Sequence, residues 1–289
     1  MSSPQVWFVT GSSSGFGRSM VEAALKKGHL VAATLRKPEV LEDLAAEYSA
    51  AQLLILKLDV TKEDEIAAAF AKVKEVFGRV DIVFNNAGIA LIGEIEATTQ
   101  EVARDSFEVL FWGATNVTRT ALEYMRDNKP VGGRILQVSS FYGVYGESGT
   151  GYYSAAKFAL EGFTESLVKE MDPEWNIKVT IIEPGPFLTG IKGNACITPA
   201  HPAYPPLPNG QTRLDPLKIA LNGNKDKAVE VFLKIATAPD PPLRLPIHKH
   251  AIAFVRKKAA SLLADADKSE VWSEDIILPP SALENGGTH

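Results

Sequence analysis

Three side chains, Ser140, Tyr153 and Lys157, have the types and the spacing for proton transfer at an alcohol or carbonyl oxygen. Tyr153 and Lys157 are four residues apart in a stretch that strongly favours a helix, so they share one helix face, one turn apart. The pKa of a free tyrosine is about 10, too high for an efficient base at neutral pH, and a neighbouring ammonium group lowers it. The alternative is an exposed helix pair, because this spacing also arises by chance.

Ser140 follows the predicted strand Arg134–Val138, which places it at the carboxyl edge of a parallel sheet, where ligands bind. There its hydroxyl is positioned to donate to a substrate oxygen while Tyr153 transfers the proton. Tyr152 has no lysine four residues later, so Tyr153 is the candidate of the two. A hydride at the neighbouring carbon needs a cofactor, because the protein supplies only proton transfer, orientation and charge stabilisation.

A glycine-rich segment after the first predicted strand has the composition of a phosphate-binding turn. It opens the first predicted helix, where main-chain amides and the helix dipole hold a pyrophosphate. The residues expected at the nucleotide are Gly11, Ser13, Ser14, Gly15, Phe16 and Gly17. An ordinary Gly/Ser turn is the alternative, but strand, turn, helix and second strand follow in the order of a dinucleotide-binding unit.

The end of the second predicted strand bears on the choice of dinucleotide. An acidic residue that binds the ribose hydroxyls of NAD is missing there, and Arg36 and Lys37 stand in its place. A guanidinium group suits a 2′-phosphate, so the sequence favours NADP(H) over NAD(H). The alternative is that Arg36 and Lys37 are solvated charges at a strand end.

These residues need a scaffold whose strands end at one edge, and the first two-thirds of the chain alternates apolar runs with amphipathic stretches. The predicted strands are Val6–Val9, Leu30–Thr34, Leu53–Leu58, Val80–Phe84, Arg134–Val138 and Lys178–Ile182. The predicted helices are Arg18–Lys27, Glu39–Tyr48, Glu63–Phe77, Gln100–Arg126 and Tyr153–Met171. This alternation predicts a doubly wound parallel sheet covered on both faces, the α/β Rossmann fold.

The pattern changes after about residue 185. Residues 186–216 are rich in Pro and Gly, which predicts a long loop that closes over substrate as a lid. Two helices are expected next, with an extended proline-rich segment between them and a loose tail at the end: Lys225–Thr237, His248–Leu263, Pro239–Pro242 and Ile277–His289. We treat residues 1–289 as a single domain, with 5–190 as its cofactor-binding and catalytic core and 191–289 as a variable extension of helices and lid.

The motifs, taken in order, resemble the classical short-chain dehydrogenase/reductase family over roughly residues 5 to 190. They are Thr10-Gly-x-x-x-Gly-x-Gly17, Leu58-Asp59-Val60, Asn85-Asn86-Ala87-Gly88, Ser140, Tyr153-Ser-Ala-Ala-Lys157, and Pro184-Gly185 with Thr189. The resemblance implies a nicotinamide-dependent alcohol dehydrogenase or ketone reductase. It also implies a homodimer or homotetramer assembled through the helices 100–126 and 153–171, although internal packing produces the same apolar faces.

The resemblance assigns further cofactor-binding residues. Asp59 and Val60 are similar to the pair that binds the adenine, and Lys157 would also bind the nicotinamide ribose beside Tyr153. The other positions form two segments, one supporting the cofactor's ribose and one holding the nicotinamide carboxamide: Asn86, Ala87 and Gly88, then Pro184, Gly185, Phe187 and Thr189.

Leu110 departs from the family pattern, which has an asparagine there that holds a water in the proton path from the lysine. Leucine has no polar group. Either the path runs through other waters or carbonyls and the enzyme is active, or the protein is a weak or inactive NADP(H)-binding sensor. Asn116, six residues later, is not on the same helix face as Leu110. Another reaction on the same scaffold, such as epimerisation or dehydration, is a third hypothesis.

The expected substrate is a small apolar alcohol, ketone or aldehyde. The pocket is predicted from Ile89–Ile95, Phe141–Thr150 and residues 186–216, with these apolar side chains: Leu91, Ile92, Phe141, Tyr142, Val144, Tyr145, Phe187, Leu188 and Ile191. Glu147 and Ser148 add polarity with no predicted direction, and core packing is the alternative for several of these side chains.

Composition excludes several other classes of protein. The net charge of −5 with dispersed basic residues argues against nucleic-acid binding. No apolar run approaches the about 20 residues of a membrane-spanning helix, and no signal peptide is visible. With Cys196 as the single cysteine, we expect a cytoplasmic protein. His248-x-His250 lacks further ligands, so we expect no metal there.

Overall fold

The computed structural model describes residues 3–189, 195–204, 220–274 and 276–277. Seven parallel strands form its main sheet, in the order β3-β2-β1-β4-β6-β7-β9. The bounds are β1 (Val6–Thr10), β2 (Leu30–Leu35), β3 (Leu53–Lys57), β4 (Ile82–Asn85), β6 (Gly133–Val138), β7 (Ile177–Pro184) and β9 (Arg244–Ile247). The order reverses between β1 and β4, so a crevice forms at the carboxyl ends of those strands.

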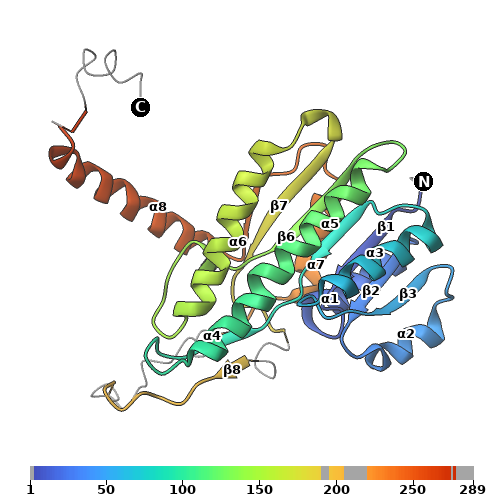
Figure 1. The fold of residues 1–289 in the computed structure, drawn as a ribbon, viewed down its shortest axis with the longest axis horizontal. Coiled ribbons are helices and arrows are strands. Elements are labelled where there is room, and N and C mark those ends of the chain that lie inside the picture. Colours follow the sequence, from blue (N-terminus) through green and yellow to red (C-terminus); the bar gives the residue numbers. More distant parts are fainter. Residues whose placement is uncertain (1–2, 190–194, 205–219, 275, 278–289) are drawn as a thin grey trace, which may run out of the picture.

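Helices cover both faces of the sheet (Figure 1). One face packs against α1 (Gly15–Lys26), α2 (Glu42–Glu47) and α7 (Lys225–Thr237), and the other against α3 (Glu63–Phe77), α5 (Ala114–Arg126) and α6 (Gly151–Glu170). Side chains alternate along a strand, so Trp7 and Val9 enter the first apolar layer while Val6 and Phe8 enter the second. The doubly wound fold predicted from the alternating pattern is confirmed.

The long helix predicted over Gln100–Arg126 is divided in the structure. It consists of α4 (Gln100–Phe107), a π-helical segment η2 (Glu108–Gly113) and α5. The apolar periodicity runs through all three, so the sequence pattern does not mark the change of winding. The predicted helix Glu39–Tyr48 likewise begins as the 3-10 turn η1 (Pro38–Leu41) before α2.

Three strands were not predicted. The strand β9 contains Pro246 and follows a proline-rich segment, and a proline is tolerated because this strand lies at the edge of the sheet. The other two are the short pair β5 (Ala90–Ile92) and β8 (Ala195–Ile197), which form a separate small sheet. Thus β8 and β9 give regular structure to parts of the chain that we predicted as loop and connection.

The C-terminal part contributes to the core as well as to the surface. Helix α7 packs against the sheet through Phe232 and Leu233, so this part of the predicted extension belongs to the main apolar layer. The last long helix, α8 (Lys249–Ser269), begins after His248, which caps it at a φ of 96° instead of forming part of it. The predicted tail lies outside the described residues beyond Ile277. None of the helices in the described part of the chain is long and apolar enough to cross a bilayer.

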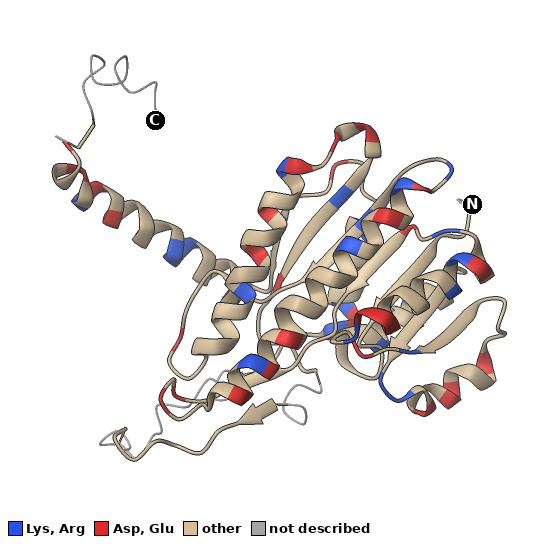
Figure 2. Ribbon diagram, viewed as in Figure 1, with Lys and Arg blue, Asp and Glu red and all other residues tan. Residues whose placement is uncertain are grey.

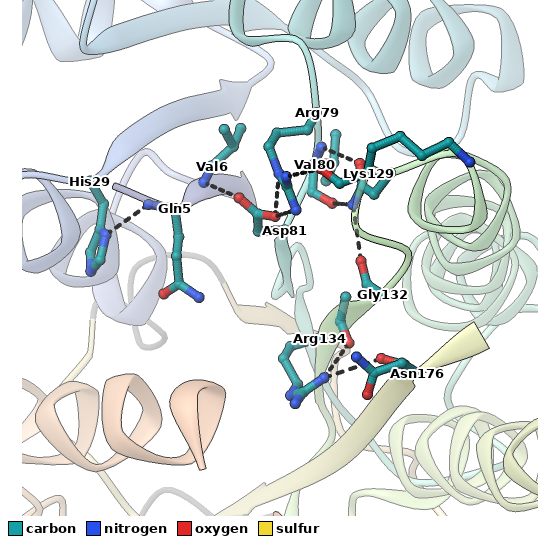
Figure 3. Close-up of polar contacts among 12 residues, drawn as sticks. Gln5, Val6, His29, Arg79, Val80, Asp81, Lys129, Gly132, Arg134 and Asn176 are labelled. Atoms are coloured by element: carbon teal, nitrogen blue, oxygen red, sulfur yellow. Dashed lines mark hydrogen bonds and ion pairs between the residues drawn. The ribbon is translucent and has the colours of Figure 1, made fainter. Parts of the chain in front are cut away.

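Polar contacts close the amino edge of the sheet (Figure 3). The Asp81 carboxylate accepts from the Val6 amide at 2.8 Å and from the Arg79 Nε at 2.6 Å, and the Arg79 Nη1 donates to the Lys129 carbonyl at 2.9 Å. These bonds tie the start of β1 to the loops before β4 and β6. The opposite, carboxyl edge holds the cavity described next.

Candidate active site

A cavity of about 720 Å³ lies at the carboxyl edge of the sheet. The nucleotide loop, the ends of β2, β4, β6 and β7, and the first turns of α6 all contribute to its wall. Every predicted catalytic or cofactor-contacting residue lines it except Gly17. A Cβ atom at Gly17 would lie 2.2 Å from the Gly11 carbonyl oxygen, so Gly17 is the residue that lets the turn pack against itself beneath the cavity.

The glycine-rich turn has the backbone shape of a phosphate cradle. Gly11 and Gly15 have φ values of 67° and 57°, which other residues rarely adopt. Helix α1 starts at Gly15, and its N-cap, Ser14, makes no side-chain capping bond, so the first amides of the helix stay available at the cavity wall. Asn86 fixes the turn from β4 by donating from Nδ2 to the Thr10 carbonyl at 3.0 Å. The turn therefore fits the pyrophosphate of a dinucleotide.

Asp59 and Arg36 form the polar end of the cavity. The Asp59 carboxylate accepts from the amide and the hydroxyl of Thr61 at 3.0 and 2.8 Å. Burial alone would raise the pKa of Asp59, but these bonds and the charges of Arg36 and Lys62 outweigh it and lower the pKa. Arg36 is exposed, so its guanidinium group is free to meet a ligand from solvent.

The three side chains predicted to transfer the proton, Ser140, Tyr153 and Lys157, lie together at the other end of the cavity. Burial raises the pKa of the Tyr153 phenol, and a hydrogen bond with Ser140 opposes that rise. Lys157 is 5% exposed, and its Nζ donates to the Val138 carbonyl at 2.9 Å. Burial lowers the pKa of Lys157 to about 8, against the partial opposition of Glu161.

A cluster of charges around the buried Glu161 and Glu183, behind Ser140 and Lys157, was not predicted. The Arg244 guanidinium group from β9 binds three carboxylates: Glu161 at 2.6 Å, Glu165 at 2.8 Å, and Glu183. Ser139 donates to Glu161 at 2.5 Å, which ties the cluster to the residue beside Ser140. Burial and the neighbouring Glu161 raise the pKa of Glu183 to about 7. The one signal in the sequence was an acid, Glu183, directly after the apolar residues Ile181 and Ile182 of a predicted strand.

Leu110 is 1% exposed and lines the cavity from the π-helical segment η2. A Cβ atom at Gly88 would lie 3.3 Å from the Leu110 Cδ2, so the leucine packs closely against the segment Asn86–Gly88. Asn116 donates to Glu63 at 3.2 Å and is absent from the cavity wall. As predicted from its helix position, Asn116 does not substitute for the missing family asparagine.

The end of the cavity beside Ser140 and Tyr153, where we expected the substrate, has mainly apolar walls. Five of the predicted pocket residues line it: Leu91, Ile92, Phe141, Tyr142 and Phe187. Others do not reach the cavity: Val144, Tyr145, Glu147, Ser148 and Leu188. Ile191 lies outside the described residues. Cys196, within the predicted segment 186–216, also lines the wall, because β8 pairs it with Leu91. Leu221 lines the wall as well, and it lies outside the predicted segments.

His248 and His250 make contacts within the fold. His248 accepts the capping bond from the His250 amide at 3.2 Å and packs against Gly185, where a Cβ atom would lie 2.8 Å from the histidine Cβ. His250 stacks on Phe254, and its ring lies edge-on to Phe141. The pair thus braces the cavity segment after β7 and the turn after Ser140.

Known proteins give the same picture of the whole chain. The family model described as short chain dehydrogenase matches residues 5–198. An uncharacterised oxidoreductase of Schizosaccharomyces pombe is 37% identical over 96% of this chain and 94% of its own. A 3-ketodihydrosphingosine reductase of Bacteroides thetaiotaomicron is 36% identical over 68% of each chain. The solved structure of a short-chain dehydrogenase from Streptomyces avermitilis superposes with a TM-score of 0.85 at 36% identity, covering 96% of this chain and all of that one. The protein therefore belongs to the short-chain dehydrogenase/reductase family and is a nicotinamide-dependent oxidoreductase.

Proposed function

We propose that the protein interconverts an apolar secondary alcohol and its ketone or aldehyde, using NADP(H). The observation that carries this proposal is the cavity itself. Among the described residues of its wall, the charged ones are Arg36, Asp59 and Lys157. The first two belong to the nucleotide end, and Lys157 is tied to the Val138 carbonyl, so the substrate end offers apolar contacts and the hydroxyls of Ser140 and Tyr153.

Each residue has a distinct part in the proposed reaction. The bound nicotinamide supplies or accepts the hydride. Ser140 orients the substrate oxygen by donating a hydrogen bond, and Tyr153 gives that oxygen a proton or takes one from it. Lys157 has a pKa of about 8, so it can release and take up a proton near neutral pH. It thereby returns a proton to Tyr153 after the phenol has given its own to the substrate.

The choice of NADP(H) rests on Arg36. Its exposed guanidinium group at the cavity wall supports this choice, because a guanidinium group suits a phosphate. Replacing Arg36 by alanine is expected to raise the KM for NADPH about 10- to 100-fold, the effect of losing a charge-assisted bond of about 1.5–3 kcal/mol. The KM for NADH should stay within about twofold. Lys37→Ala is the matched control, because Lys37 is not part of the cavity wall. Equal loss with both cofactors would rule out the assignment to the 2′-phosphate.

The substrate class is tested with purified protein, NADPH and a series of neutral ketones of increasing chain length. Consumption of NADPH that rises with apolar length, and a poor rate with carboxylate-bearing analogues, is the expected outcome. The related 3-ketodihydrosphingosine reductase supports including long-chain amino ketones in the series. Conversion of a substrate without net change in NADPH would instead indicate epimerisation or dehydration.

A second candidate function is supported by Leu110. With that apolar side chain at the wall, a cofactor-binding protein without turnover is the alternative, and binding of NADPH with no turnover across the series would establish it. The variant Leu110→Asn tests whether the missing asparagine limits turnover. A gain in turnover with unchanged NADPH affinity indicates that the proton path limits the rate.

We also propose that copies of the chain associate through α4, α5 and α6, as the family resemblance implies. We further propose that the protein is located in the cytoplasm. Trp112, in the segment η2 between α4 and α5, is 52% exposed, and Phe158 on α6 is 40% exposed, which leaves apolar surface for a partner. Phe158→Glu should reduce the mass measured by sedimentation. The single exposed cysteine suits a reducing compartment.

A further inference from the structure

Helix α8 projects from the body of the protein, and only its first two turns are held there (Figure 1). Ala251 is its one buried residue. Phe254 packs against Phe141 with 5.5 Å between ring centroids, and the Lys257 Nζ donates to the Tyr145 hydroxyl at 3.1 Å. From Ala259 onward, every described residue of the helix is exposed. A helix gains most of its stability from packing, so this length of unpacked helix is unexpected in an isolated chain.

An apolar stripe runs along α8 from its first turns into the projecting part. Ile252, Val255, Ala259, Leu262 and Ala266 follow one another at spacings of three and four residues, which places them on one helix face. Leu262 is 55% exposed, and the adjoining Leu263 is 67% exposed. Small and large side chains alternate along the stripe, an arrangement that lets a second helix approach closely.

The charges beside the stripe change sign along the helix. Arg256, Lys257 and Lys258 lie near its middle, and Asp265 and Asp267 lie beyond, as the blue and red bands on α8 show (Figure 2). None of these five forms an ion pair with another described residue. Lys258 and Asp265 are seven residues apart, so they lie on the same flank of the stripe.

We propose that α8 pairs antiparallel with α8 of a second copy of this chain. In an antiparallel pair, each step forward along one helix matches a step backward along the other. If Ala259 faces Leu262 of the second copy, Val255 therefore faces Ala266. The same register sets Lys258 beside Asp265 of the second copy, and two-fold symmetry makes this contact twice. In a parallel pair, the flank that carries Lys258 and Asp265 would face the opposite flank of the second helix, so these two side chains would not meet.

A lipid surface fits the stripe less well. Anionic membranes bind helices whose polar face is rich in lysine and arginine, whereas Asp265, Asp267 and Glu270 surround the most exposed leucines of α8. The surface is complementary to itself, which is the property of a symmetric interface. The inference is independent of the proposed activity, since it uses no residue of the catalytic cavity.

Sedimentation of the full chain at fixed concentration tests the pairing. In the Phe158→Glu background, which removes the proposed interface at α6, Leu262→Asp is expected to halve the mass of the assembly. Lys258→Asp should weaken the association roughly tenfold, because it sets two aspartates together at both symmetric contacts. The double variant with Lys258→Asp and Asp265→Lys should restore the wild-type mass. Lys268→Asp is the control, since it makes the same charge change on the opposite helix face.

Each variant changes an exposed or half-buried side chain of the projecting helix, and its melting temperature should match the wild type at low concentration, which shows that it folds. An unchanged mass for Leu262→Asp overturns the proposal. So does failure of the double variant to restore association, because the antiparallel register requires that exchange. Co-sedimentation with anionic phospholipid vesicles that Leu262→Asp abolishes, without any change in mass, would assign the stripe to a membrane instead.

Discussion

Two cations beside Glu161, the buried Lys157 and the partly exposed Arg244, differ in their partners. The Lys157 Nζ has a backbone carbonyl as its hydrogen-bond acceptor, and burial lowers its pKa to about 8. Arg244 binds three carboxylates, and its pKa is raised: burial lowers it, but the bonds to Glu161 and Glu165 outweigh that effect. The comparison shows that the balance of partners separates a cation that can release a proton near neutral pH from one that only holds structure.

The largest expected effect is on turnover and concerns Tyr153, the proposed proton donor beside Lys157. Tyr153→Phe removes the proton donor and should lower kcat by about 10²–10⁴-fold, while affinity for NADPH stays within a few-fold. Cofactor binding is measured by fluorescence titration and kcat by NADPH consumption. Tyr152→Phe is the control, because it removes a neighbouring hydroxyl that is not part of the cavity wall. Full activity in Tyr153→Phe would contradict the proposed mechanism.

Removing the structural cation should act on stability. Arg244→Met leaves Glu161 and Glu183 buried without their shared counter-charge, and the free energy of unfolding at pH 7 should fall by about 3–5 kcal/mol. Denaturant titration measures this loss. The deficit should shrink as pH falls and the stranded carboxylates take up protons. Arg256→Met, on the exposed part of α8, is the control, and a comparable loss there would show that the effect is not specific to the cluster.

The titration of Lys157 should determine how kcat depends on pH on the alkaline side. Lys157 is protonated below its pKa of about 8, so kcat for ketone reduction should fall as pH rises through that value. In Lys157→Met, kcat should be lower by about 10²-fold, and this limb should vanish. A limb of the same position in the variant would assign it to another group.

The smallest expected effect concerns Glu183. The pKa of this carboxyl in the folded protein is about 7, raised above its ordinary value of 4.5, so the folded state binds the proton more tightly than the unfolded chain does. Its contribution to stability is therefore fully present below pH 4.5 and is lost as pH rises through about 7. Glu183→Gln should remove this loss, which amounts to about 1–3 kcal/mol, and melting temperatures between about pH 5 and 8 measure it. A slope that persists in the variant would place the titration elsewhere.

The sequence predicted the fold and most of the site because both depend on local patterns. The bounds of α3 and α7 matched the expected ranges, as Gly78 at a φ of 78° ends α3 and Asn224 caps α7. The charge cluster and β9 escaped prediction for a physical reason. Arg244 meets Glu161 across 83 residues, and a charged residue next to prolines has the composition of a surface connection.

The last strand carries a consequence for how the chain is made. Glu161 and Glu183 are synthesised well before Arg244, which follows Glu183 by some 60 residues. During synthesis, these two buried carboxylates therefore lack the guanidinium group that pairs with them in the folded protein. Until then, the β6-α6-β7 unit cannot pack without burying two uncompensated carboxylates. A nascent or truncated chain that stops short of that arginine should remain open to proteases at this end, however complete its nucleotide half is.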